Sequence, residues 1–120
     1  MPSLTSLQQE SILCCVKKML GLDADYDAFD TDIIVCINSA LMTCMQLGVG
    51  PKEGFTVTGN SETWDDFLED DLIQLQAVKQ FVYLKVKQTF DPPESSFVNA
   101  SIDRTVDELA WRLNVQAEDG

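Results

Sequence analysis

Residues 23–32, DADYDAFDTD, are the stretch of this chain most suggestive of chemistry, because five aspartates occur in ten positions. Carboxylate oxygens are preferred Ca²⁺ ligands, and Asp23, Asp25 and Asp27 alternate as in the start of a calcium loop. Such a loop needs glycine at its sixth position and glutamate at its twelfth, where this chain has Ala28 and Ile34. We therefore predict no calcium site at this stretch.

The same aspartates fit the start of a helix. Acidic side chains at a helix N-terminus cap free amides and complement the helix dipole. Asp27, Asp30 and Asp32 lie where an apolar helical pattern begins, and Asp23 and Asp25 are then solvated loop charges.

A second group of acids surrounds the segment TWDDFLED, for which Thr63 predicts a helix cap. A two-metal site needs carboxylates that converge from several elements, whereas these crowd one short helix. We predict a solvated acidic surface and no metal. Its members are Glu62, Asp65, Asp66, Glu69, Asp70 and Asp71.

Other catalytic arrangements are missing from the sequence. The chain has no histidine, so a cysteine nucleophile would have no imidazole base. The segment GVGPKEG lacks the GK[ST] ending of a phosphate-binding loop. The four cysteines form no C-x-x-C pair and are expected to be free, buried apolar residues. We predict that the protein is not an enzyme and uses no cofactor.

Length and charge narrow the class of protein further. The 120 residues suit one domain, 1–120, and the N-terminus does not resemble a signal peptide. No apolar run is long enough to span a membrane, so we expect a protein made and kept in a cytoplasm. The net charge of −12 argues against non-specific binding to nucleic acid, which requires clustered lysine and arginine.

Helical periodicity predicts an all-α bundle of four to five helices with one long glycine-rich loop at about 48–62. The expected helices cover about 5–20, 30–47, a short segment after Thr63, 72–90 and 96–114. The 72–90 helix is apolar over a wide arc, which predicts a central position. Residues 115–120 are predicted to form a flexible tail.

Trp111 in the last helix has two possible roles. It lies beside, not on, the apolar stripe that includes Val106 and Leu109. Tryptophan and arginine are enriched at binding hot spots, so Trp111 with Arg112 suits an interface. A tryptophan that fills the core of the bundle is equally compatible with this position, and both interpretations stay open.

Several segments, in this order, resemble a known family. They are KKMLGL, DTDIIVCINSALMTCMQLGVGP, WDDFLEDD, AVKQFVYLKVKQTFDPP and DELAWRLN. Over about residues 10–117 the chain is similar to small head–tail connector (adaptor) proteins of long-tailed bacteriophages and prophages of Gram-positive bacteria. None of these segments is a catalytic motif.

The resemblance implies a structural protein of the virion neck, made in the host cytoplasm. Such adaptors form a ring of typically about twelve copies under the portal protein. The ring extends the DNA channel and carries the stopper or tail-completion protein. It implies portal docking by Trp111, Arg112, Leu113, Asn114 and Val115, and a channel or stopper contact by Val49, Lys52, Glu53 and Phe55. Asp65, Asp66, Glu69, Asp70 and Asp71 become candidates for an acidic channel wall.

The acidity agrees with this function, because an acidic channel repels phosphates and lets double-stranded DNA pass without specific binding. Two alternatives are open. A small, very acidic protein can mimic DNA and inhibit a host DNA-binding protein, or the chain can be an unspecified helical interaction module.

Overall fold

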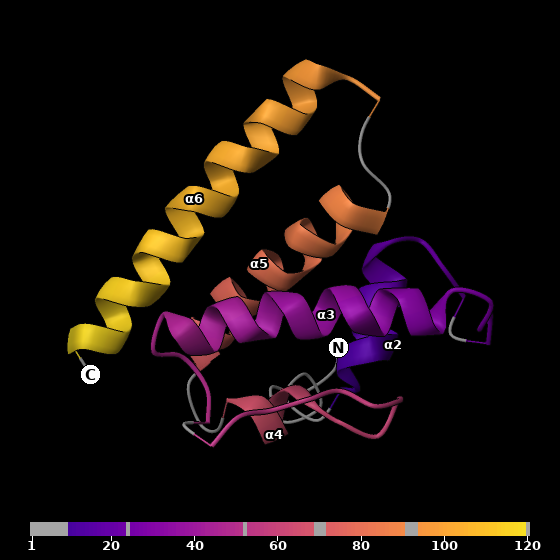
Figure 1. Ribbon diagram of the computed structural model, residues 1–120, viewed down its shortest axis with the longest axis horizontal. Helices are drawn as coiled ribbons and strands as arrows, with labels where there is room; N and C mark the ends of the chain where they lie inside the picture. Colours follow the sequence, from indigo (N-terminus) through magenta and orange to yellow (C-terminus); the bar gives the residue numbers. More distant parts are fainter. Residues whose placement is uncertain (1–9, 24, 52, 69–71, 91–93, 120) are drawn as a thin grey trace.

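Five helices make up most of the chain that the computed structural model describes, and no strand occurs among those residues (Figure 1). The described residues are 10–23, 25–51, 53–68, 72–90 and 94–119, without the side chains of 72–74 and 116–119. The helices are α2 (Ile12–Met19), α3 (Asp30–Gln46), α4 (Trp64–Phe67), α5 (Leu72–Phe90) and α6 (Ser96–Asp119). The prediction of an all-α fold with four to five helices is confirmed.

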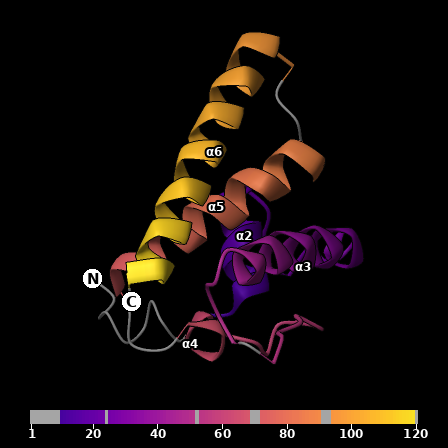
Figure 2. The ribbon, with the colours of Figure 1, turned by 60° about the vertical axis from the view of Figure 1, so that its left-hand side comes forward.

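Helix α5 is the centre of the arrangement, as its wide apolar arc predicts. It packs against α3, α6 and α2 (Figure 2). Because α5 meets helices on several sides, its buried positions do not form a single narrow stripe. They are Leu75, Val78, Phe81, Val82 and Val86.

Helix α6 lies along α5 at one edge of the molecule (Figure 1). Its buried residues Val106, Leu109 and Leu113 follow the predicted stripe. The predicted end near residue 114 is wrong, because the backbone stays helical to Asp119. No glycine or proline before Gly120 ends this helix, so its last turns continue where the sequence predicts a tail.

Helix α2 begins later than the predicted start near residue 5, and residues 1–9 lie outside the described part. The Ser11 hydroxyl accepts a hydrogen bond from the Cys14 amide at 3.3 Å, which caps α2. Gly21, with φ of 84°, allows the turn that follows the helix. The bounds of α3 and α5 agree with the predictions within one residue.

The start of α3 differs from the prediction in one detail. Asp30 and Asp32 occupy its first turn, but the N-cap residue is Phe29, and no side chain caps the free amides there. The Asp30 carboxylate instead pairs with Lys17 of α2.

The segment between α3 and α4 is held against the helices at several points. The Asn38 side chain accepts a hydrogen bond from the Val57 amide at 2.7 Å and donates one to the Val57 carbonyl at 3.0 Å. Thr63 and Asp66 form a reciprocal capping box on α4, which confirms the predicted Thr63 cap. Val49 and Val57 are buried, so this segment contributes to the core.

Candidate functional site

The predicted docking residues lie in the C-terminal part of α6, and some of them are exposed while others are buried. Trp111 is 67% exposed, so the structure places it at the surface and not in the core. Arg112 is exposed and forms an ion pair with Glu108, one helical turn away, at 2.6 Å. Leu113 is fully buried.

Asn114 and Val115 lie at the border of this surface. The Asn114 side-chain amide donates a hydrogen bond to the Leu47 carbonyl at 3.2 Å, which fastens α6 to the end of α3. Val115 is half-buried. Of the predicted docking residues, Trp111 and Arg112 are therefore the ones that present most of their side chain to a partner.

The fold also buries some of the predicted channel or stopper residues and exposes others. Val49 is buried, and Phe55 packs edge-on against Phe67 with ring centroids 5.3 Å apart. Glu53 is exposed, and Lys52 lies outside the described residues. A surface pocket of about 300 Å³ lies at this place. Its lining residues are Gly50, Pro51, Glu53, Asp66, Phe67 and Leu68.

Two of the acids around α4, Asp66 and Glu62, take part in local hydrogen bonds. The Asp66 carboxylate accepts a hydrogen bond from the Thr63 amide at 3.0 Å, and Asp65 is half-buried. Glu62 accepts hydrogen bonds from the Thr58 hydroxyl at 2.7 Å and from the Gly59 amide at 3.3 Å. The Thr58 bond is the main cause that lowers the pKa of Glu62.

The remaining members of this acidic group, Glu69, Asp70 and Asp71, lie outside the described residues. Their contribution to a channel wall stays a prediction.

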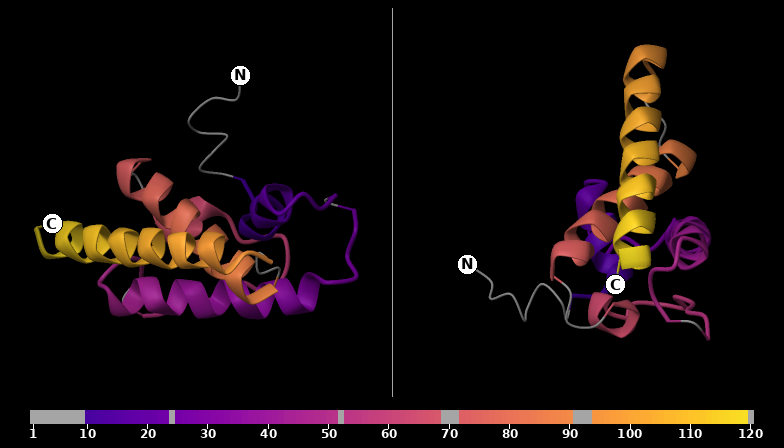
Figure 3. Two further views of the ribbon diagram at one scale, coloured as in Figure 1. Left: turned by 90° about the horizontal axis from the view of Figure 1, so that it is seen from above. Right: turned by 90° about the vertical axis from the view of Figure 1, so that its left-hand side faces the viewer.

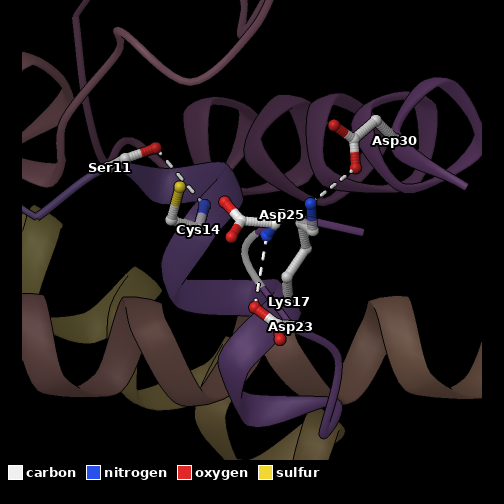
Figure 4. A network of polar contacts seen from close by, with 6 residues as sticks. All are labelled: Ser11, Cys14, Lys17, Asp23, Asp25 and Asp30. Atoms are coloured by element: carbon white, nitrogen blue, oxygen red, sulfur yellow. Dashed lines mark hydrogen bonds and ion pairs between the residues drawn. The ribbon is translucent and has the colours of Figure 1, made fainter. Parts of the chain in front are cut away.

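Three of the aspartates in this region, Asp23, Asp25 and Asp30, take part in local contacts with α2 and within the loop (Figure 4). The Lys17 ammonium lies 2.9 Å from the Asp30 carboxylate, and the Asp25 amide donates to the Asp23 carboxylate at 3.3 Å. Within the described part of the chain, no cluster of three or more cysteine, aspartate or glutamate side chains is placed to hold a metal ion.

The four cysteines are all free thiols. Burial raises the pKa of Cys15 to about 11 and that of Cys44 to about 12. At Cys15 the indole of Trp64 opposes this shift, but burial is the larger effect. Burial, and secondarily the charge of Asp32, also raises the pKa of Cys36.

These pKa shifts predict slow thiol chemistry in the folded protein. At pH 8 a thiol with a pKa of about 11 is ionised in roughly one molecule in a thousand, and only the thiolate reacts. We expect iodoacetamide to modify the half-buried Cys14 and Cys36 first, and Cys15 and Cys44 only after denaturant is added. Peptide mass spectrometry over time measures this order, and equal rates at Cys44 and Cys14 would contradict it.

Three exposed apolar residues were not predicted from the sequence. Val35 and Met42 are exposed on α3, and Phe97 is exposed near the start of α6. A signal for them exists, since Val35 and Met42 are seven residues apart, as are Phe97, Arg104 and Trp111. Residues seven apart lie on one face of a helix. Without the fold, nothing indicates that these faces point away from the core.

Comparison with known protein families gives one match. A family model described as phage connector protein matches residues 12–120. No curated protein and no solved structure matches the chain.

Proposed function

Because this chain belongs to the phage connector protein family, we propose that it assembles as a ring beneath the portal and joins the capsid to the tail. Membership of the family already implies a structural role in the virion and association with other head or tail proteins. Among the described residues, no helix combines the length and apolar character needed to cross a membrane. The ring, its copy number of about twelve and the DNA channel are the specific parts of the proposal.

The observation that supports assembly most strongly is the exposed face of α6. Trp111 is largely exposed and has Arg104 and Arg112 near it in the helix, and tryptophan and arginine are the residue types enriched at interface hot spots. We call Phe97, Arg104 and Trp111 the outer face of α6. This face and the C-terminal end of the helix, at Arg112 and Val115, are the surfaces that we propose for assembly, with the portal at the C-terminal end.

The acidic surface near α4 suits the channel side of such a ring. Asp66 and Glu53 line the pocket at Gly50, Asp65 is next to Asp66, and Glu69, Asp70 and Asp71 follow in sequence. Negative charges on a channel wall repel DNA phosphates and oppose non-specific binding. We propose that this side faces the DNA or the stopper.

The experiment that tests the proposal is a native mass measurement of the purified protein, alone and mixed with the portal protein of the same phage. We expect a ring-sized complex with the portal. A compact monomer or dimer that does not bind the portal would contradict the proposal. Binding to a host DNA-binding protein in that case would favour a DNA mimic.

Arg112 provides a sharper test of portal docking. Arg112→Glu reverses an exposed charge that takes part in an exposed ion pair, so we expect little loss of stability. We expect the affinity for the portal to fall about tenfold, or ~1.4 kcal/mol. Lys18→Glu, at an exposed position of α2, is the matched control and should bind normally. Equal effects of the two variants would place the portal contact elsewhere.

A further inference from the structure

The outer face of α6 carries side chains at a regular seven-residue spacing, and these side chains are exposed in a single copy. Phe97 and Trp111 are 77% and 67% exposed, and Arg104, midway between them, is also exposed. These residues lie opposite the buried side of the helix, at Leu109 and Leu113, which packs toward α5. Covering these large apolar side chains with another surface would remove apolar area from water and so favour association.

Helix α3 carries a second unpartnered face. Val35 and Met42 are 63% and 57% exposed, and the small, exposed Ser39 lies between them. On a helix, residues i, i+3, i+4 and i+7 border a hole that accepts a side chain of a facing helix, and the i+3 position here is the half-buried Asn38. Because the small Ser39 lies between the bulkier Val35 and Met42, the hole between them can accept a large aromatic side chain. Asp32, one heptad before Ser39, is exposed on the same side.

We propose that the outer face of α6 in one copy packs in parallel along α3 of a second copy. Trp111 then lies over Ser39, between Val35 and Met42, and Arg104 meets Asp32. This inference rests on the proposed function, because it names the partner of the surface by which the ring assembles.

The register follows from equal spacings on the two helices. Trp111 and Arg104 are seven residues apart, as are Ser39 and Asp32, so each pair spans about 10.5 Å. Packing Trp111 on Ser39 in the parallel sense therefore brings the positive Arg104 next to the negative Asp32.

The alignment of α6 with α3 can be extended by seven residues toward the N-terminal ends of the two helices. It places Phe97 near the segment before α3, where Tyr26 and Phe29 are exposed and their rings meet edge-on at 5.7 Å. In the described part of the chain, neither Asp32 nor Arg104 has an ion-pair partner of its own.

The directions of the helices fit this contact. In one copy, α3 and α6 run in the same general sense, and their C-terminal ends meet where Asn114 bonds to Leu47 (Figure 1 and Figure 3). A neighbouring copy that is shifted sideways and turned modestly brings its α6 onto α3 without being inverted. The two faces differ, so the contact is heterologous and closes into a ring when its rotation closes. Trp111 is thereby assigned to the neighbouring copy, and not to the portal that the family resemblance implies.

A charge exchange tests the contact on the full chain in the presence of the portal. Asp32→Arg and Arg104→Asp should each raise the protein concentration needed for half-maximal ring assembly at least tenfold, measured by native mass spectrometry. The double variant restores an opposite-charge pair at every contact and should return to within about threefold of the wild type. Lys18→Asp changes the net charge by the same amount as Arg104→Asp, at an exposed position of α2 away from the contact, and should assemble normally.

The outcomes separate this inference from the proposed function. If the wild type assembles but the double variant is not rescued, or the single variants assemble normally, the contact is wrong and the portal becomes the partner of Trp111. If the wild type does not assemble at all, the proposed function itself fails. Should a charge variant unfold, Ser39→Cys with Trp111→Cys gives a second test, since the contact predicts disulfide-linked ladders on a non-reducing gel that the wild type does not form.

Discussion

Replacing Asp30 with asparagine is expected to lower the free energy of unfolding by about 3 kcal/mol. The Lys17 ammonium belongs to a residue that is 1% exposed, and it lies 2.9 Å from the Asp30 carboxylate. A charged amine inside a protein is tolerated because a neighbouring carboxylate offsets part of its desolvation cost. Asparagine keeps the size of the side chain but removes its negative charge. We expect a value near the low end for buried pairs, because Asp30 retains partial contact with solvent. Urea denaturation of both proteins measures the difference.

The same contact predicts a contrast between single and double variants. Lys17→Met combined with Asp30→Asn removes both charges and replaces the lysine with an apolar side chain of similar length. Such replacements of buried pairs are often neutral, so we expect the double variant within about 1 kcal/mol of the wild type. Asp32→Asn, in the same first turn of α3, is the matched control and should cost below about 1 kcal/mol. If Asp30→Asn and Asp32→Asn have equal effects, the ion pair does not stabilise the packing of α2 on α3.

The sequence was informative where local patterns decide the structure. The apolar periodicity of α3 and α5 predicted their bounds, and Thr63 predicted the cap of α4, because these features depend on residues within one or two turns. The end of α6 was missed, since a helix without a stop signal ends according to its surroundings.

The features that depend on packing could not be predicted in this way. The pairing of Lys17 with Asp30 requires that α2 lie against the first turn of α3, which no local pattern specifies. The exposure of Trp111, Val35 and Met42 depends on which sides of α6 and α3 the neighbouring helices cover. Helix periodicity groups residues on a face but does not say whether that face meets the core, a partner or solvent. For this reason the candidate interface depends on the packing of the helices and not on their periodicity alone.

Gly50→Ala is the second substitution with a large expected effect, a loss of about 3 kcal/mol in the free energy of unfolding. Gly50 has φ of 100°, a conformation that alanine adopts only with strain. An added Cβ would also lie 2.6 Å from two ring atoms of Phe67. Phe67 is buried, and its ring meets Phe55 edge-on at 5.3 Å, so the ring cannot move aside without disturbing its neighbours.

Gly54→Ala separates the two causes of this loss. Gly54 has φ of 101°, almost the same as Gly50, but an added Cβ there meets no atom within 4 Å. We therefore expect Gly54→Ala to cost only the backbone strain, about 1–2 kcal/mol, and Gly50→Ala to cost more by the repacking of Phe67. Both values come from urea denaturation of the two variants. Equal losses would show that Phe67 yields without cost, and that the pocket between Gly50 and α4 is not a rigid part of the surface that we propose for the channel side of the ring.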